Sequence, residues 1–463
     1  MPRTVAETVN ADYLAQWVAT QAGFAGVPGV QVAVAVGGEV VLDAAWGVAD
    51  VGTGEPLRTD HLFRVASHSK TFTAVAVARL AERGLLRLDD TFDAYVPELE
   101  GSAAGRVTLR EALGHTGGVL RDGTDADFWQ LGAPFPDRAG LLTAVLDGEV
   151  FGRGEHFKYS NLTYGLLGLV VRAVTGMPYA EHVRADLLEP LGLADTHPEL
   201  DDELADRCVT GHSGRSPHDD RRLPVAPVAT GALAAATGFC STARDLVRWA
   251  GALTDGSGLL RPETRRLLHR DESVIDRPHA RTRRYGLGFE TRRIEGRRVV
   301  GHSGGFPGQI TRTWVDPDDG LAVSVLTNAV DGPADPLATG VFALAAKALA
   351  SRESADGDGD GDELDLDSWT GRFANLWGYR DVVRLGGRLW LLDPREPDPL
   401  TGAEPLDVDG DVLRPEPHAG FGPVGEPVHV LRDDDGTPAA IVVGGMTAWR
   451  AEDYERQRES FFA

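Results

Sequence analysis

Phe63-Arg64-Val65-Ala66-Ser67-His68-Ser69-Lys70 runs directly into the small and apolar stretch Thr71-Phe72-Thr73-Ala74-Val75-Ala76-Val77. The apolar residues after Ser67 recur with a helical period, which predicts a buried helix with Ser67 at its N-terminus. Free backbone N–H groups and the helix dipole favour developing negative charge at that end. Ser67 and Lys70 are three positions apart, so a helix places both side chains on one face. The stretch therefore predicts an activated serine nucleophile.

Lys70 is notable because lysine is rare in this chain. It is one of three lysines, with Lys158 and Lys347, among 46 lysine and arginine residues. Arginine stays protonated in proteins, whereas a lysine amine loses its proton when it is desolvated or placed beside another cation. A lysine at this position can therefore act as the base that activates Ser67.

Size and charge bound the remaining possibilities. With 463 residues and 42% hydrophobic content, the chain can bury a large core in two or three domains. Seventy acidic against 46 basic residues give a net charge of −24, which argues against nucleic acid or an anionic membrane as a partner. The polar start Met1–Glu7 has no signal-peptide character and no run of roughly 18 apolar residues occurs, so we expect a cytoplasmic protein.

Cofactors and disulfides are not expected. Cys208 and Cys240 are too few for a disulfide framework. No His, Cys or Asp cluster has metal-ligand spacing, so we predict neither a metal nor another cofactor.

The pattern of helices and strands predicts an α+β domain. Residues from about 5 to 22 look helical, and the β-rich runs 30–36 and 39–43 around Gly37-Gly38 predict a hairpin. A mainly helical middle follows, in which Ser241 or Thr242 with Asp245 resembles a helix start. Later strands are predicted at 285–289, 298–300, 311–315 and 321–326, before a helix at about 334–350. We expect the first and last strands to pair across some 250 residues.

The C-terminal part differs in composition from the rest. Residues 351–364 are rich in Asp and Gly, as expected of a solvated linker. Beyond it, short alternating segments such as 381–385, 388–392 and 440–443 are separated by Gly, Pro and Asp turns. They predict a small antiparallel β-barrel. The expected domains are therefore 1–350, the linker 351–364 and the barrel 365–463.

Two further motifs follow the serine in a known order. Tyr159-Ser160-Asn161 lies roughly 90 residues after Ser67, and His302-Ser303-Gly304 lies roughly 140 residues further on. With Ser-x-x-Lys, these motifs resemble the class C β-lactamase and penicillin-binding-protein family over about residues 8–350. Supporting similarities occur at 84–90, 113–118, 189–193 and 285–288. The resemblance implies a β-lactamase/transpeptidase-like antiparallel sheet with a helical domain.

The resemblance also implies the roles of the site residues. Ser67 would attack an acyl carbon, and Lys70 with Tyr159, as amine and phenolate, would move its proton to the leaving group. Asn161 would orient Lys70 and the substrate amide. Backbone N–H groups of Ser67 and Gly305 would form the oxyanion hole. Ser303 and Gly304 are candidate substrate-binding residues on the same glycine-rich strand.

His302 departs from the most common form of the third motif. β-Lactamases and transpeptidases usually carry Lys-Thr-Gly there, where the ammonium attracts a substrate carboxylate. A histidine is mostly neutral at pH 7, so a fixed cation is absent. His-x-Gly resembles the D-aminopeptidase, esterase and acyltransferase branches of the family, which argues against penicillin hydrolysis as the natural activity.

The C-terminal barrel resembles the lipocalin-like domain appended to some of these enzymes. They include D-peptide hydrolases and the stand-alone penicillin-binding-protein-type thioesterases that cyclise nonribosomal peptides. Arg450 is a candidate barrel cation that reaches toward the active site to hold a peptide carboxylate.

Three functions remain open on the sequence. The first is a thioesterase that cyclises peptidyl thioesters with D-configured residues, presented as small molecules or on a carrier protein. The second is a D-aminopeptidase or esterase in which water is the acceptor, and the third is a catalytically dead binding protein. The intact Ser67, Lys70, Tyr159, Asn161 and His302 argue against the third. We expect no nucleic-acid or membrane partner, and the sequence does not give the oligomeric state.

Overall fold

The computed structural model describes residues 4–254, 256–275, 283–355, 365–420 and 423–461. The chain forms two compact units. One unit is Gly26–Ala338, and the other joins the N-terminal residues through Ala25 with the chain from Thr339 onward. The domain limits of 1–350, 351–364 and 365–463 remain predictions, and residues 356–364 of the linker lie outside the described residues.

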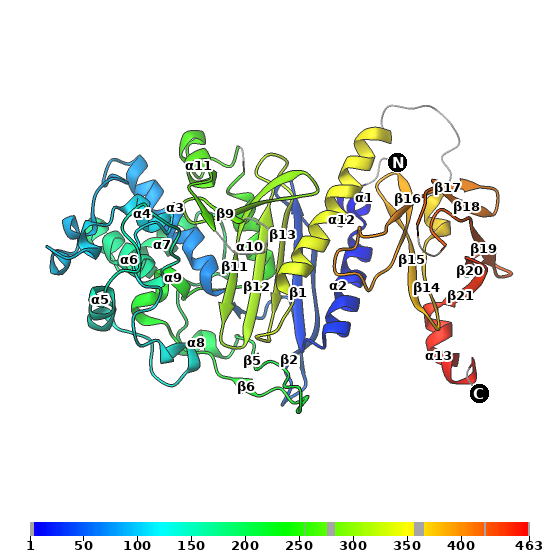
Figure 1. Cartoon of the computed structure of the whole chain (residues 1–463), viewed down its shortest axis with the longest axis horizontal. Helices are drawn as coiled ribbons and strands as arrows, with labels where there is room; N and C mark the ends of the chain where they lie inside the picture. The colour runs from blue at the N-terminus through cyan, green and yellow to red at the C-terminus, as the bar shows by residue number, and fades with distance from the viewer. Residues whose placement is uncertain (1–3, 255, 276–282, 356–364, 421–422, 462–463) are drawn as a thin grey trace. The chain divides into compact units, whose positions relative to one another are not determined.

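An antiparallel sheet runs through the Gly26–Ala338 unit (Figure 1). Within the described residues the strand order is β3-β2-β1-β13-β12-β11-β10-β9-β8. In chain order the strands are β1 (Gly29–Val36), β2 (Glu39–Asp50), β3 (Glu55–Pro56), β8 (Ser273–Ile275), β9 (Arg283–Tyr285), β10 (Glu290–Ile294), β11 (Arg297–Phe306), β12 (Gln309–Val315) and β13 (Ala322–Thr327). Val30 of β1 lies opposite Thr327 of β13, which confirms the predicted pairing of the first and last strands.

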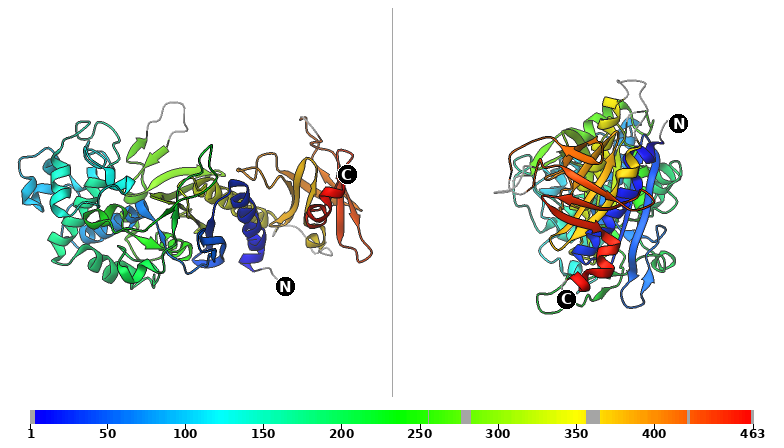
Figure 2. Two further views of the ribbon diagram at one scale, coloured as in Figure 1. Left: turned by 90° about the horizontal axis from the view of Figure 1, so that it is seen from below. Right: turned by 90° about the vertical axis from the view of Figure 1, so that its right-hand side faces the viewer.

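The sequence between β3 and β8 is mainly helical, with α-helices between short strands. The α-helices are α3 (Ser69–Glu82), α4 (Leu109–Leu113), α5 (Arg138–Leu146), α6 (Asn161–Thr175), α7 (Tyr179–Val183), α8 (Asp202–Ala205), α9 (Ala234–Thr237), α10 (Ala243–Gly251) and α11 (Pro262–His269). α10 packs against β1, β12 and β13, whereas α3, α6 and α9 pack on one another. The left view of Figure 2 shows this helical group beside the strands. The α+β expectation is confirmed.

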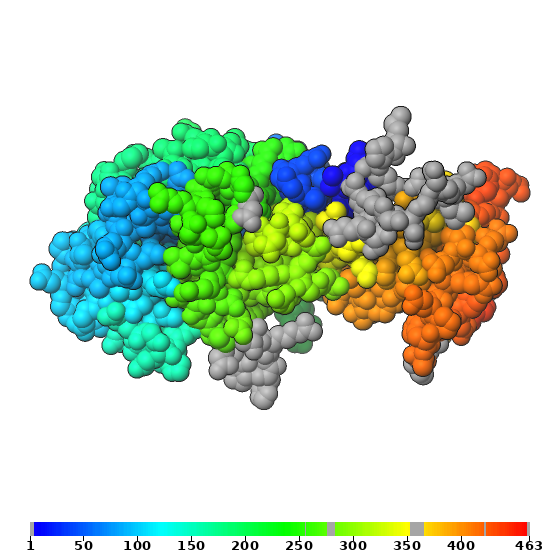
Figure 3. Space-filling model, turned by 90° about the horizontal axis from the view of Figure 1, so that it is seen from above, coloured from blue at the N-terminus to red at the C-terminus, as the bar shows by residue number. Residues whose placement is uncertain are grey.

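Contacts between distant parts of the chain hold the helical group against the strands. Figure 3 shows blue segments from the first quarter of the chain beside green segments from the second half. Arg110 of α4 forms a bidentate ion pair with Glu272, with nitrogen-to-oxygen distances of 2.7 and 2.9 Å. The small sheet of β4 (Phe63–Arg64) and β7 (Cys240–Ser241) adds a second link, because it joins the segment before Ser67 to the segment before α10.

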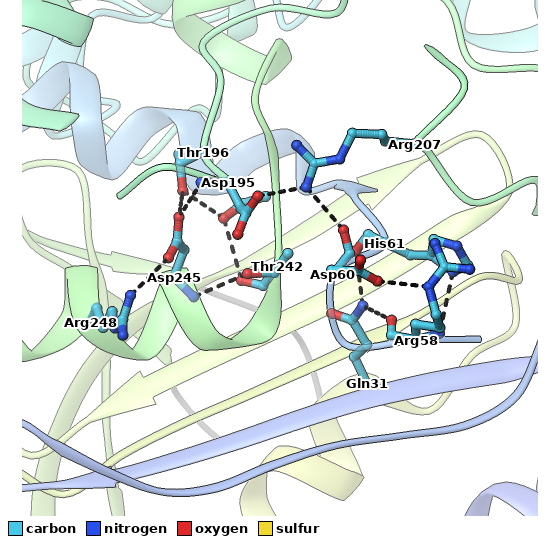
Figure 4. A network of polar contacts seen from close by, with 11 residues as sticks. Gln31, Arg58, Asp60, His61, Asp195, Thr196, Arg207, Thr242, Asp245 and Arg248 are labelled. Atoms are coloured by element: carbon cyan, nitrogen blue, oxygen red, sulfur yellow. Dashed lines mark hydrogen bonds and ion pairs between the residues drawn. The ribbon is translucent and has the colours of Figure 1, made fainter. Parts of the chain in front are cut away.

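A polar network fixes the loop that leads into β4 (Figure 4). Gln31 of β1 donates to the carbonyl oxygens of Arg58 at 2.7 Å and His61 at 2.9 Å. Arg207 donates to the carbonyl oxygen of Asp60 at 3.2 Å. Thr242 caps α10 by accepting from the N–H of Asp245, as the sequence predicts for this helix start. The network ties the approach to Ser67 to the first strand of the sheet.

Two predicted elements differ in detail. The predicted strand at 285–289 is wrong, because β9 ends at Tyr285 and Gly286–Phe289 form a bend before β10. Gly288 has a φ of +91°, and a Cβ there would lie 2.3 Å from the Cβ of Ala74. The predicted helix at 5–22 is two helices, α1 (Val5–Val9) and α2 (Ala11–Ala25), since Asn10 adopts a left-handed φ of 55° between them.

The second unit contains a closed antiparallel barrel of eight strands among its described residues, which confirms the predicted lipocalin-like barrel. The strands are β14 (Gly371–Asn375), β15 (Gly378–Leu385), β16 (Arg388–Leu392), β17 (Glu404–Asp409), β18 (Val412–Pro415), β19 (Val428–Arg432), β20 (Pro438–Val443) and β21 (Met446–Arg450). Apolar residues such as Phe373, Leu389 and Ile441 alternate along the strands and form its core. α13 (Ala451–Phe461) follows β21.

The N-terminal helices contact barrel residues, which explains their place in this unit. Asn10 donates to the carbonyl oxygen of Arg384 at 3.0 Å. The Tyr13 hydroxyl donates to Asp381 at 3.0 Å, and Gln21 donates to the carbonyl oxygen of Pro394 at 2.7 Å. α12 (Ala334–Ala355) begins in the first unit and continues into the second. In the described part of the chain, no helix combines the length and apolar character needed to cross a membrane.

Candidate active site

Ser67 lies in a short turn directly before α3, two residues ahead of the helix start at which its sequence predicts it. A short 3₁₀ turn, Ala66–His68, precedes the α-helix that begins at Ser69. Ala66 has a φ of +46°, in the left-handed region that non-glycine residues rarely adopt. The N–H of Val65 donates to the carbonyl oxygen of Phe239 at 2.9 Å and holds the segment in place. The surrounding structure thus maintains a strained turn directly before the nucleophile.

Lys70 is placed to act as the base for Ser67. Its Nζ lies 3.2 Å from Ser67 Oγ, 2.7 Å from Asn161 Oδ1 and 2.8 Å from the carbonyl oxygen of Ala236. Complete burial lowers the pKa of Lys70 well below its ordinary value, and Asp122 only partly opposes this effect. A neutral amine has two hydrogens and one lone pair. Because Asn161 and Ala236 accept the hydrogens, the lone pair is left for the Ser67 hydroxyl.

Tyr159 is the second group on the nucleophile. Its hydroxyl donates to Ser67 Oγ at 2.8 Å, and its ring lies 4.2 Å from the His115 ring, centroid to centroid. Burial raises the pKa of Tyr159 above its ordinary value, although the hydrogen bond with Ser67 opposes the change. The phenol therefore keeps its proton in the free protein. This differs from the phenolate expected by resemblance, and it equips Tyr159 to donate a proton to a leaving group.

Asn161 is oriented by a residue that the sequence analysis missed. Its side-chain N–H donates to Asp122 Oδ1 at 2.7 Å, so its oxygen is the atom that faces Lys70. Asp122 is 6% exposed. Ser160 caps α6 by accepting from the N–H of Thr163. No motif marks Asp122 in the sequence, since it lies in an irregular segment and its role depends on a contact with a residue 39 positions away.

His302 is buried and neutral. Its Nε2 lies 2.9 Å from the Tyr285 hydroxyl, and its Nδ1 lies 2.6 Å from the carbonyl oxygen of Ser303. A carbonyl only accepts, so Nδ1 carries the hydrogen and Nε2 accepts from Tyr285. Burial lowers the pKa of His302 to about 4, although Glu290 opposes the change. The third motif therefore supplies no fixed cation near pH 7.

The residues that follow His302 have distinct surroundings. Ser303 Oγ donates to Glu290 Oε1 at 2.9 Å. A Cβ on Gly304 would lie 2.2 Å from the carbonyl oxygen of Val65, so only glycine fits beside the nucleophile segment. β10 pairs with β11 only as far as Gly301, and it leaves the next residues, through Phe306, without a partner from β10. Such an edge gives a substrate backbone access to Gly305.

A pocket of about 410 Å³ joins these groups. Ser67, Tyr159, His302, Ser303 and Gly305 line it together. The pocket thus brings together most of the site residues predicted from the sequence. Lys70 lies behind Ser67 and is hydrogen-bonded both to it and to Asn161. The oxyanion role of the Ser67 and Gly305 N–H groups remains a prediction.

Charged residues also line this pocket, among them Arg121, Arg283 and Glu290. Burial alone would raise the pKa of Glu290, but Arg312 at 3.1 Å and other neighbours hold it at about 2. Arg283 lies 3.7 Å from the same carboxylate. The sequence analysis missed Glu290, because an acidic residue on a strand has no distinguishing pattern.

Arg450 belongs to the barrel unit. Its guanidinium donates to the carbonyl oxygen of Pro438 at 2.5 Å and to that of Thr370 at 3.5 Å. It also lies 5.4 Å from the centre of the Phe373 ring. Its contact with a substrate carboxylate remains a prediction. Among the described residues, no cluster of His, Cys, Asp or Glu could hold a metal ion.

The state of Lys70 predicts the pH dependence of acylation. Because the neutral amine is the base and its pKa is lowered, the rate should rise with pH and level off well below pH 10.5, its ordinary pKa. Asp122 raises the pKa of Lys70, so Asp122→Asn should move the midpoint to lower pH while an amide oxygen still accepts from Asn161. A pH–rate profile with an activated D-aminoacyl ester measures both effects. A flat profile, or a midpoint that moves to higher pH in Asp122→Asn, would contradict Lys70 as the base.

The arrangement matches a known family. Residues 14–347 match the sequence pattern of the family described as Beta-lactamase. The chain belongs to the β-lactamase family. Members of this family are serine hydrolases or acyltransferases, which agrees with the Ser67, Lys70 and Tyr159 set and supports an enzyme.

Individual β-lactamase family relatives differ in how much of the chain they share. Penicillin-binding protein 4 of Amycolatopsis lactamdurans is 28% identical over 313 residues, which is 65% of this chain and 81% of that protein. D-aminopeptidase of Brucella anthropi is 28% identical over 324 residues, or 66% of this chain, and the match spans 57% of that protein. The structure of SurE is 24% identical with a TM-score of 0.59, and the match covers 96% of this chain and all of SurE. Because the match covers nearly the whole chain, it shows that SurE shares the fold of this protein, including the C-terminal barrel.

Proposed function

We propose that the protein is an acyl-serine enzyme that takes a peptidyl thioester or ester onto Ser67 and releases the peptide by macrocyclisation. The observation that carries the acyl-serine part is the part-buried set in which Ser67 Oγ lies 3.2 Å from Lys70 and 2.8 Å from Tyr159. The acyl residue is D-configured in this proposal. The D-aminopeptidase of Brucella anthropi supports that choice, since it is a relative named for D-residues.

Acylation follows from the positions of these groups. Lys70 takes the proton of the Ser67 hydroxyl as Oγ attacks the acyl carbon, and the new C–O bond places negative charge on the carbonyl oxygen. The N–H groups of Ser67 and Gly305 stabilise that oxygen. Tyr159 donates its proton to the leaving thiolate or alkoxide and regains one from Lys70. The products are an acyl-Ser67 ester and a free thiol or alcohol.

Release requires a nucleophile in the second step. In cyclisation, the free amine of the same peptide attacks the acyl carbon, loses a proton through Lys70, and the Ser67 oxygen leaves with a proton. A tethered amine can outcompete water because proximity gives it a high effective concentration. The neutral His302 supports acyl groups without the free carboxylate that a cationic third motif attracts. We also propose that a carrier protein presents the peptide to the enzyme. The proposed location of the protein is the cytoplasm.

A second candidate is a D-stereospecific aminopeptidase or esterase, in which water replaces the amine. The 28% identity to D-aminopeptidase favours it directly. Both candidates use the same acylation chemistry and differ only in the acceptor. The catalytically dead alternative has no support, because the four polar groups behind and beside Ser67 are intact.

The acceptor can be tested with one substrate. A linear peptide thioester mimic with a D-residue at its acyl end and a free amine should give cyclic peptide in excess over free acid, measured by liquid chromatography and mass spectrometry. The same peptide with an acetylated amine should give only acid. If the free-amine peptide is merely hydrolysed, while amides and esters of D-amino acids turn over well, the aminopeptidase or esterase proposal replaces cyclisation.

A further inference from the structure

A second pocket of about 640 Å³ lies beside the catalytic pocket in the Gly26–Ala338 unit. Phe157 lines both pockets. Strand β8 also serves both, since Val274 lines the second pocket and Ile275 lines the catalytic one. Among the described residues, β8 is the edge strand at one side of the sheet. The two pockets are therefore neighbours that share a ring and an edge strand.

Apolar surface in the second pocket is accessible. Val274 is 45% exposed, so it presents apolar surface in this pocket. Phe151 also lines the pocket and packs its ring against His156, with centroids 4.7 Å apart. Phe157 is held between the His115 and Tyr285 rings, each with its centroid 5.6 Å away. These side chains provide an apolar contact surface on a fixed support.

The charge in the second pocket is negative. Glu272 and Glu155 both line it. Arg110 neutralises Glu272 through the bidentate ion pair at 2.7 and 2.9 Å. Glu155 accepts from the N–H of Gly152 at 3.0 Å and has no cationic partner among the described residues. An apolar surface beside a carboxylate suits a group that combines an apolar side chain with a positive charge.

We propose that this second pocket binds the amino-terminal part of the peptidyl substrate whose acyl end is attached to Ser67. An apolar side chain of the peptide packs on Phe151 and Val274, and the terminal ammonium lies near Glu155. The inference rests on the proposed function, because it requires an acyl group longer than one residue. Phe157 lines both pockets, so a peptide chain that leaves the catalytic pocket past Phe157 would enter this pocket directly.

Binding at a distance from the reacting carbon has a kinetic consequence. Contacts to remote parts of a substrate can be used to lower the barrier at the reacting centre, so long substrates gain and short ones do not. They also keep the free end of the peptide in the same site as the acyl ester, which favours intramolecular attack. The second pocket is thus a determinant of substrate length.

Two variants test the proposal by different chemistry. Val274→Trp fills the second pocket from an exposed strand position, and Glu155→Gln removes its charge. Val51→Trp is the matched control, since Val51 is 43% exposed and lines neither pocket. The substrates are a linear peptidyl thioester mimic with a free amine, the same peptide acetylated at that amine, and a short D-aminoacyl ester.

Val274→Trp should lower kcat/KM for both peptides by about tenfold or more, the equivalent of 1.4 kcal/mol, and leave the short ester unchanged. Glu155→Gln should lower kcat/KM only for the free-amine peptide. The proposal is overturned if the peptides react equally well in all variants, or if the short ester loses as much as the peptides in Val274→Trp. Failure of the proposed function would look different, since the wild-type protein would then give no cyclic peptide from the free-amine substrate, or would acylate Ser67 with none of the substrates.

Discussion

Replacing Ser67 by alanine should abolish covalent acylation of the protein. Ser67 Oγ is the atom on which Lys70 and Tyr159 converge, at 3.2 and 2.8 Å. The substitution removes the nucleophile but leaves both neighbours in place. Turnover of an activated D-aminoacyl ester should fall by on the order of 10³-fold or more. Intact-protein mass spectrometry with a fluorophosphonate should show one adduct on the wild-type protein and none on Ser67→Ala.

The fold should survive this change. Alanine has a high helix propensity, and Ser67 lies in the short turn before α3 rather than in the packed core of that helix. Circular dichroism and the melting temperature should match those of the wild-type protein. Labelling of Ser67→Ala at the wild-type rate would show that the nucleophile is another residue.

Lys70→Arg should lose activity by on the order of 10²–10⁴-fold, the usual contribution of a general base. Arginine keeps the positive charge and cannot give up a proton to become a base. Burial lowers the pKa of the wild-type lysine, and its neighbours accept two hydrogens, so its lone pair can serve as the base. Single-turnover acylation of an activated ester measures the step directly.

A matched lysine in the same chain provides the control. Lys347 lies over the Trp390 ring at 4.5 Å in the barrel unit, where arginine can make the same contact. Lys347→Arg should therefore acylate at the wild-type rate. If Lys70→Arg retains most of its activity, Lys70 only positions the substrate, and the base is a different group.

Much of the site could be predicted because the chemistry depends on residues with distinctive local patterns. Ser67 and Lys70 are three positions apart at a helix start, and Tyr159 and Asn161 precede an apolar helix. Asp122 and Glu290 could not be found in this way. Asp122 acts through Asn161, 39 residues away, and Glu290 through Ser303 on a neighbouring strand. The carbonyl of Ala236 has no side-chain signal at all.

The fold was predictable where local pattern and tertiary packing agree. The hairpin at Gly37-Gly38 and the barrel strands follow from alternation and turn residues. The strand at 285–289 was predicted wrongly because aromatic and aliphatic residues alternate there with two glycines. Packing decides that segment, because Gly288 must approach Ala74 of α3 with a positive φ. Sequence alternation does not report such a contact.

The attachment site of a peptidyl group is the most direct test of the acyl-serine proposal. Trypsin releases residues 65–70 as one short peptide, since Arg64 precedes it and Lys70 ends it. After rapid acid quenching of a reaction with a peptidyl thioester mimic, fragmentation of this peptide should place the acyl group on Ser67 rather than Ser69. The modified fraction should decay as the cyclic product appears. Product formation without any acylated 65–70 peptide, or with the acyl group on another residue, would contradict the proposed mechanism.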